Sequence, residues 1–206
     1  MKKTKYIIFD LGAVLLNIDY QKTIDGFKKL GVKNASEFYS KKTQKNIFDL
    51  LECGKISEQR FVDKFQETYD KASYAEIISA WNALLLDLPQ SRINLLKKIR
   101  KKYDIYLLSN TNSIHINEFR KQIGETKYLE FYNLFKKVYY SYEIGFRKPN
   151  KEAFQIILNE NNINPREVLF VDDSPQHING ARLLGIQTYH LKDNEEISSV
   201  LPDIIQ

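Results

Sequence analysis

The stretch YIIFDLGAVLLNIDY, residues 6–20, decides the fold. Its first four residues are an apolar run, and a carboxylate, Asp10, stands where that run stops. Because strands buried in a parallel sheet are short, continuous apolar runs, the pattern predicts a strand that ends at Asp10. Two positions later the chain has Gly12, which carries no side chain that can ionise.

Further along the chain, short apolar runs alternate with amphipathic stretches. From residue 138 the order is VYYS, NKEAFQIILNE, VLFVDDS, QHINGARLLG and QTYHL, and upstream YDIYLLSN has the same strand character. Alternation of strands and helices is the signature of a parallel sheet with crossover helices. With residues 6–9, the sequence predicts an α/β, Rossmann-like core whose five-stranded parallel sheet is flanked by helices. One of these helices, SRINLLKKIR, is expected to begin with Ser91 as its N-cap.

Residues 19–88 have a different pattern. Apolar residues recur there at helical spacing, as in Phe61 and Phe65 or Ile77 and Trp81, and no convincing strand is present. The sequence therefore predicts a small all-helical insertion after strand one, with Pro89 marking the return. We expect residues 1–18 and 89–206 to form the core, and residues 19–88 to form the insertion.

Composition excludes several classes of protein. The net charge of +5 comes from lysines scattered along helical stretches, without the clustered basic and aromatic residues of a nucleic-acid-binding surface. Cys53 is the single cysteine, so neither an intrachain disulfide nor a thiolate metal cluster can form. We find no signal-peptide core and no apolar run of membrane length, and we expect a cytoplasmic protein with no membrane partner. The sequence does not indicate an oligomeric state.

Polar residues follow each predicted strand at the edge where parallel sheets bind ligands. They comprise three carboxylates, a hydroxyl, an amide and an amine: Asp10, Ser109, Asn110, Lys148, Asp172 and Asp173. Each has a simpler explanation, because aspartate often caps a helix and Ser or Asn often forms turns. The coincidence of four strand exits with compatible groups favours a site. Adjacent carboxylates near a third one also favour a bound cation.

These residues together resemble the motifs of the haloacid dehalogenase superfamily of phosphohydrolases. The resemblance covers nearly the whole chain, through FDLGAVL, LLSNTN, GFRKP and VLFVDDSPQHINGARLLG. The distance between the first two motifs is typical of the subgroup whose helical cap is inserted after strand one. The segments FDLG, ECGKIS, LLSNTN and FRKP are similar to those of alpha-D-glucose-1-phosphate phosphatase-like proteins.

The resemblance implies a role for each motif residue. Asp10 would attack phosphorus and carry an aspartyl phosphate. Mg²⁺ would be held by Asp10, the backbone carbonyl of Gly12 and Asp173, with Asp172 behind them or bound through a water. Ser109, the backbone amide of Asn110 and Lys148 would bind the phosphoryl oxygens. His177 stands where many members carry Asn or Asp, and its default interpretation is a surface helix residue. The expected substrate is a small phosphorylated metabolite such as a hexose 1-phosphate.

Gly12 departs from the family pattern, since most phosphatases of the superfamily carry there a second Asp that serves as general acid and base. Loss of such a group typically costs about 10² to 10⁴ in rate. Three explanations stand open: a substrate with a good leaving group, a substitute acid such as Asp19 or His115, or a phospholigand-binding protein without catalysis. Asp19 also suits a helix cap, and His115 a packed or solvated helix position.

Substrate choice in capped members depends on cap residues that face the site. The loop of Cys53, Gly54 and Lys55 is the candidate here, with a plain turn between two helices as the alternative.

Overall fold

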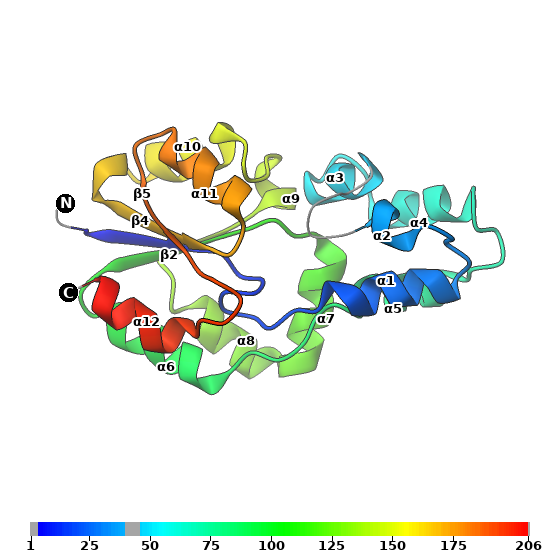
Figure 1. Ribbon diagram of the computed structural model, residues 1–206, viewed down its shortest axis with the longest axis horizontal. Helices are drawn as coiled ribbons and strands as arrows, with labels where there is room; N and C mark the ends of the chain where they lie inside the picture. Colours follow the sequence, from blue (N-terminus) through cyan, green and yellow to red (C-terminus); the bar gives the residue numbers. More distant parts are fainter. Residues whose placement is uncertain (1–3, 40–45, 206) are drawn as a thin grey trace.

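The computed structural model describes residues 4–39 and 46–205. Its sheet has five parallel strands in the order β3-β2-β1-β4-β5 (Figure 1). The strands are β1 (Tyr6–Phe9), β2 (Asp104–Ser109), β3 (Lys137–Tyr140), β4 (Val168–Asp172) and β5 (Gln187–His190). The α/β fold and the five strands expected from the sequence are therefore confirmed.

The central strand, β1, sets the position of the site. Phe9 is paired with Leu107 of β2 and with Val171 of β4, so the three strands end at the same edge of the sheet. Asp10, which follows β1, and Ser109 and Asp172, which end β2 and β4, are brought to one edge although they lie far apart in the sequence. All three are buried.

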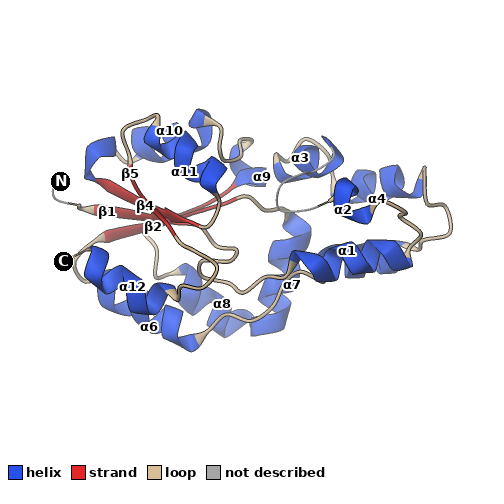
Figure 2. Cartoon of the chain, in the orientation of Figure 1, coloured by secondary structure: helices blue, strands red, loops and turns tan. Residues whose placement is uncertain are grey.

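Helices cover both faces of the sheet, because alternate strand residues point to opposite sides. Ile7 and Phe9 pack with one set of helices and Ile8 with the other. The first set is α6 (Gln90–Ile99), α7 (Ser113–Ile123), α8 (Glu125–Tyr132) and α12 (Ile197–Ile204); the second is α10 (Lys151–Glu160) and α11 (Pro175–Arg182). Short helices α9 (Ser141–Ile144) and η1 (Pro165–Glu167) complete this part. Figure 2 shows the strands between the two helical layers.

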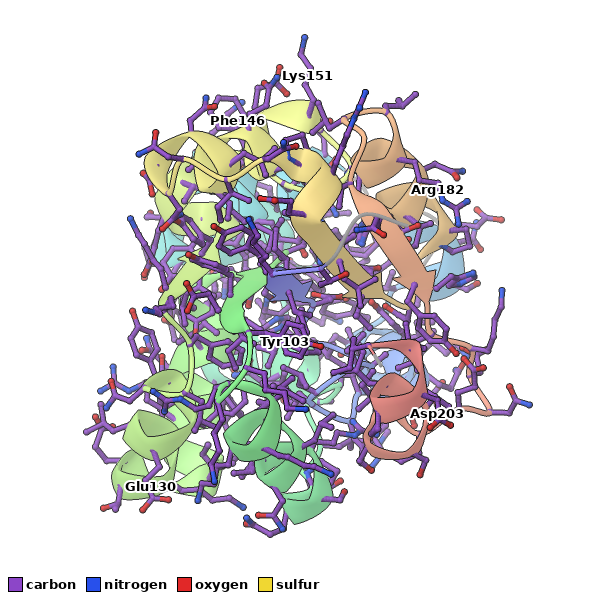
Figure 3. All side chains as sticks on the ribbon, turned by 90° about the vertical axis from the view of Figure 1, so that its left-hand side faces the viewer. Tyr103, Glu130, Phe146, Lys151, Arg182 and Asp203 are labelled. Atoms are coloured by element: carbon purple, nitrogen blue, oxygen red, sulfur yellow. The ribbon has the colours of Figure 1, made fainter. Side chains whose placement is uncertain are left out.

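The end-on view in Figure 3 separates the same two layers. Lys151 and Arg182, from α10 and α11, lie on one side, and Glu130 and Asp203, from α8 and α12, lie on the other. One local expectation was wrong: α6 begins at Gln90 with Pro89 as its N-cap, not with Ser91. Proline suits that place because it has no backbone N–H to leave unpaired in the first turn.

Within its described residues, the insertion contains five helices: α1 (Tyr20–Lys29), α2 (Ala35–Phe38), α3 (Asn46–Glu52), α4 (Glu58–Gln66) and α5 (Tyr74–Asn82). They pack around an aromatic core of their own, with Phe27, Phe48 and Trp81 at its centre. In Figure 1 these helices lie beyond the carboxyl edge of the sheet, away from both termini. On this packing we propose the division into a core of residues 1–18 and 89–206 and a cap of residues 19–88.

Within the described residues, no helix has both the length and the apolar character needed to cross a bilayer.

The aromatic core of the cap gives a test of its stability. Phe27 is fully buried and contacts the rings of Phe38, Tyr39, Phe48, Phe65 and Trp81. Phe27→Ala leaves a cavity and is expected to lower the free energy of unfolding by about 3–5 kcal/mol. Urea denaturation measures this loss. The control is Leu183→Ala, where the side chain is 88% exposed and the change should stay within about 0.5 kcal/mol. Equal losses in both variants would contradict the packing described.

Candidate active site

A cavity of about 380 Å³ opens at the carboxyl edge of the sheet, between the core and the cap helices. The core contributes residues from every motif identified in the sequence, and the cap contributes several aromatic, aliphatic and acidic residues. Among the described residues, the lining includes Asp10, Gly12, Ser109, Asn110, Lys148, Asp173 and His177 from the core, and Tyr20, Tyr39, Asp49, Glu52, Leu84 and Leu85 from the region of the cap. The strand-end residues thus share one cavity, as their positions in the sheet require.

Lys148 stands between two carboxylates at the base of the cavity. Its ammonium nitrogen is 2.7 Å from Oδ1 of Asp10 and 2.8 Å from Oδ2 of Asp172. Lys148 and Asp172 are fully buried, and Asp10 is nearly so. Buried charges are tolerated when they are paired and hydrogen-bonded, and this arrangement satisfies both conditions.

The two carboxylates differ in the groups around them. Burial alone would raise the pKa of Asp172, but the Lys148 ammonium and a hydrogen bond from His177 outweigh it and hold that pKa at about 2. The backbone N–H of Ser174 also donates to Asp172 Oδ1, at 2.7 Å. At Asp10, burial raises the pKa to about 8, opposed by Lys148 and reinforced by the negative charges of Asp172 and Asp173. Asp172 is therefore ionised at neutral pH. Asp10 is the carboxyl group whose ionisation a cation or ligand in the cavity would change most.

The side chain of Asn110 holds the Lys148 backbone in place. Its amide nitrogen donates to the Lys148 carbonyl at 2.9 Å, and its Oδ1 accepts from the Lys148 N–H at 2.8 Å. A second pair of bonds joins the same two segments, because Ser141 Oγ accepts from the Thr111 N–H and donates to the Thr111 carbonyl. The segment after β2 thus fixes the segment that carries Lys148.

The oxygen donors of the cavity suit a hard divalent cation. Asp10, Gly12 and Asp173 all line the cavity, and carboxylate and carbonyl oxygens are the ligands that Mg²⁺ prefers. Asp172 differs, since both of its oxygens already accept hydrogen bonds, from Lys148, Ser174 and His177. It therefore fits a positioning role better than direct coordination. Asp10, Asp172 and His177 each offer an atom that could bind a metal within 4.8 Å of the others, but His177 Nδ1 is engaged with the Asp172 oxygens.

The space above Gly12 is occupied by an aliphatic side chain. A Cβ placed on Gly12 would lie 3.0 Å from Cδ1 of Ile18, so any larger residue requires Ile18 to move by a few tenths of an ångström. The next residue, Ala13, has a φ of 59°, which tightens the turn that directs the chain towards the cap. Ile18 thus occupies the space that a side chain at position 12 would enter. This loop does not place another carboxylate there.

Of the two proposed substitutes for the missing acid, Asp19 is the N-cap of α1 and accepts from the Gln21 N–H at 2.9 Å. This is the structural role that the sequence offered as the alternative, and Asp19 is absent from the described lining of the cavity. Asp19 is therefore occupied by capping.

The other candidate, His115, lines the cavity but has partners for both ring nitrogens. Nε2 lies 3.2 Å from the carbonyl of Trp81, which can only accept, so this nitrogen carries the proton. Nδ1 then accepts from the side-chain amide of Asn112 at 3.3 Å. The ring also stacks on Trp81, with centroids 4.4 Å apart. These contacts describe a packed histidine that joins the cap to the core.

The default interpretation of His177 as a surface residue was wrong. The first turn of α11 directs its ring to Asp172, with Nδ1 3.0 Å from each carboxylate oxygen, and the residue is mostly buried. Burial lowers its pKa, and the carboxylate opposes that effect. Its position two residues after Pro175, in the helix that starts at the acidic motif, was the available signal in the sequence.

Three residues that line the cavity had no role predicted from the sequence. Arg147 was part of the quoted GFRKP motif but received no role, and Asp49 and Glu52 are separated by three positions on α3, the spacing that puts two side chains on one helix face. The nominated loop of Cys53, Gly54 and Lys55 lies outside the described lining of the cavity. Gly54 instead packs against the backbone of Tyr142, where a Cβ would lie 2.2 Å from the carbonyl oxygen.

Comparison with known proteins identifies the family. A model of the haloacid dehalogenase-like hydrolases matches residues 4–185. The chain belongs to this family. A D-ribitol-5-phosphate phosphatase from Bacteroides thetaiotaomicron is 33% identical over 191 residues, which are 90% of each protein.

Solved structures agree with the family assignment. A haloacid dehalogenase family enzyme from Bacteroides thetaiotaomicron, in complex with magnesium and inorganic phosphate, superposes with a TM-score of 0.88 at 37% identity, covering 96% of this chain and 98% of that one. A haloacid dehalogenase-like hydrolase from Porphyromonas gingivalis gives a TM-score of 0.86 at 27% identity and covers 98% of both chains. The L-2-haloacid dehalogenase of Xanthobacter autotrophicus, at 15% identity and a TM-score of 0.61, with 91% of this chain and 77% of that one covered, shares the fold.

The buried lysine gives the second prediction. Lys148→Met leaves Asp172 buried without its cation, and we expect the free energy of unfolding to fall by about 3–5 kcal/mol. Asp10→Asn keeps the pair between Lys148 and Asp172 and should cost much less. Denaturation in the presence of a chelator compares the two variants. A Lys148→Met protein as stable as the wild type would show that the buried pairing is not as described.

The third prediction concerns pH and His115, whose pKa burial lowers to about 4. Because the unfolded chain binds this proton below about pH 6.5 and the folded chain does not, the stabilisation present above pH 6.5 is lost as the pH falls to about 4. The loss is on the order of 3 kcal/mol. His115→Gln removes this titration, so the difference in stability between wild type and variant should shrink over that window. A difference that is constant with pH would contradict a buried, neutral His115.

Proposed function

We propose that the chain is a Mg²⁺-dependent phosphatase that hydrolyses a small phosphorylated metabolite through a phosphoryl group carried on Asp10. The observation that supports this most strongly is the pairing of Asp10 with the buried Lys148 at the base of a cavity that also contains Ser109 and Asn110. The related ribitol-phosphate phosphatase and the magnesium and phosphate in the superposed structure support the same chemistry.

In the first step, a carboxylate oxygen of Asp10 bonds to phosphorus while the bond from phosphorus to the ester oxygen breaks. The departing oxygen takes a proton from water. In the second step, a water oxygen bonds to phosphorus and the water gives up a proton to solvent, where it neutralises the hydroxide left by the first step. The bond between phosphorus and Asp10 breaks, and inorganic phosphate leaves with Asp10 again a carboxylate. Dividing the displacement in this way replaces one difficult reaction with two easier ones.

Three groups of the core would bind the phosphoryl oxygens. Two N–H bonds of Lys148 go to Asp10 and Asp172, and we assign a phosphoryl oxygen to the third. Ser109 and Asn110 line the same cavity, and the Ser109 hydroxyl and the Asn110 backbone amide would donate to other oxygens. Donors fixed in advance stabilise charge in the transition state without reorganisation.

Mg²⁺ would be held by Asp10, the Gly12 carbonyl and Asp173. When bound, it supplies positive charge that screens the repulsion between the Asp10 carboxylate and the phosphate dianion. Asp172, through its bonds with Lys148 and His177, would keep the lysine ammonium at the correct place.

The absence of a carboxylate at Gly12 makes the leaving group important. With the proton supplied by water, esters with a good leaving group, such as a hexose 1-phosphate, should react faster than primary alkyl esters such as ribitol 5-phosphate. The substrate of the relative is a primary ester, so a panel must contain both kinds. The competing function is a phospholigand-binding protein without turnover.

The fourth prediction is Mg²⁺-dependent release of phosphate from p-nitrophenyl phosphate, glucose 1-phosphate and ribitol 5-phosphate. Activity should disappear with a chelator and fall by at least about 10³ in Asp10→Asn, which removes the nucleophile. The matched control is Asp70→Asn, an exposed position of the cap, which should retain wild-type activity.

Turnover by Asp10→Asn at the wild-type rate would contradict the role of Asp10. Tight phosphate binding in calorimetry without any release of phosphate would support the binding protein instead.

A further inference from the structure

His190 is the last residue of β5, the strand beside β4 (Figure 1). The parallel register pairs it with Asp172, the last residue of β4. Its side chain is half-buried, and His190 is not among the described residues that line the cavity. Asp173, the residue after Asp172, does line the cavity. His190 thus lies beside the segment that carries a carboxylate proposed for Mg²⁺, outside the cavity itself.

Both ring nitrogens of His190 have partners, and these partners fix the position of the proton. Nε2 lies 3.1 Å from the backbone carbonyl oxygen of Asp173, which can only accept, so Nε2 carries the proton. Nδ1 lies 2.7 Å from the ammonium nitrogen of Lys192, which can only donate, so Nδ1 accepts. The two contacts require the same tautomer. Lys192 therefore keeps the imidazole in the form that donates to Asp173.

The end of β5 holds two successive carbonyl groups of the acidic segment. The backbone N–H of Leu191 donates to the Asp172 carbonyl at 3.0 Å, and the imidazole of His190 donates to the Asp173 carbonyl. The first bond joins two backbones and does not depend on a particular side chain. The second is made by a side chain, so one substitution at His190 removes it and leaves the strand pairing in place.

The loop after β5 supports the same contact. The Glu195 side chain accepts from the backbone N–H of Lys192 at 2.8 Å and from the hydroxyl of Tyr189 at 2.9 Å. Glu195 therefore links the residues on either side of the segment that contains His190. This fixes the backbone from which the imidazole and the Lys192 ammonium extend.

The position of the Asp173 backbone matters because Mg²⁺ tolerates little error in its ligands. It requires near-octahedral geometry, with oxygen ligands at about 2.0–2.1 Å. Groups that hydrogen-bond behind the ligands orient them, and loss of one typically costs about 10- to 100-fold in metal affinity. The side chain of Asp172 is already held by Lys148 and His177. The bond from His190 gives the neighbouring Asp173 a comparable support through its backbone.

We propose that His190 is a positioning residue of the Mg²⁺ site, which holds the Asp173 carbonyl and thereby directs the Asp173 carboxylate to the cation. The proposal rests on the metal site of the proposed function, and it adds a residue outside the four sequence motifs. Since His190 lies outside the described lining of the cavity, its effect on the cation is exerted through Asp173.

Calorimetric titration of the metal-free protein with MgCl₂ tests this role. His190→Ala should weaken Mg²⁺ binding by at least about tenfold. His190→Gln retains an N–H near the place of Nε2 and should bind Mg²⁺ within about threefold of the wild type. The matched control is Thr188→Ala, two positions earlier on β5, which removes an acceptor for Arg182 and not the bond to Asp173. It should retain the wild-type affinity.

Phosphate release gives an independent measure. In His190→Ala, the Mg²⁺ concentration for half-maximal activity should rise by the same factor, while kcat at saturating Mg²⁺ stays within about threefold of the wild type. A merely structural role predicts the opposite, a lower kcat from loss of folded protein at unchanged Mg²⁺ affinity. If His190→Ala does not fold, His190→Asn gives the same comparison, because its amide is too short to reach the Asp173 carbonyl.

Wild-type Mg²⁺ affinity in both His190→Ala and His190→Asn would overturn the proposal. Equal losses in His190→Ala and His190→Gln, or in His190→Ala and Thr188→Ala, would also overturn it, because the loss would then not depend on the bond to Asp173.

The same titration separates this proposal from the proposed function, because it requires no turnover. If the wild type binds Mg²⁺ but releases no phosphate, and His190→Ala binds Mg²⁺ about tenfold more weakly, the phosphatase function fails and the role of His190 stands. If phosphate release depends on Mg²⁺ and the two proteins bind it equally, the role of His190 fails and the phosphatase function stands.

Discussion

The contact on which the rest of the site depends is the ion pair of Lys148 with Asp10 and Asp172. An ammonium with no exposure to solvent is stable only between carboxylates, and both of them come from the ends of neighbouring strands. The Asn110 side chain and Ser141 hold the loop of Lys148 in the position that this pairing requires. The buried lysine and its two carboxyl partners thus lie at the place where a phosphate and a cation would be bound.

The core and the cap both contribute residues to the lining of the cavity. The core supplies an edge of polar groups, and the cap adds Tyr20 from α1, Tyr39 from the end of α2 and the acidic residues of α3 to the lining. The cap is joined to the core by contacts of different kinds: the stack of Trp81 on His115, the approach of Gly54 to Tyr142, and the ion pairs of Arg147. Two of these residues, His115 and Arg147, also line the cavity.

Much of this arrangement was predictable from the sequence, because apolar runs that end in Asp10, Ser109 or Asp172 specify both strands and the edge where they meet. The direction in which single side chains point was not predictable from the sequence. His177 was interpreted as a surface residue of its helix, because its place in the first turn of α11 does not by itself specify that the ring points to Asp172. Arg147 and Glu52 are far apart in the sequence, and their pairing depends on how the cap sits on the core.

The central claim is that Asp10 carries the phosphoryl group, and mass spectrometry of the acid-quenched reaction tests it most directly. Because no carboxylate at Gly12 activates water for the second step, we expect the phosphorylated form to accumulate during turnover of a substrate with a good leaving group. The peptide that contains Asp10 should then gain the mass of one phosphoryl group, which should disappear once the substrate is exhausted. Sustained turnover with the added mass on another residue, or on none, would contradict the claim.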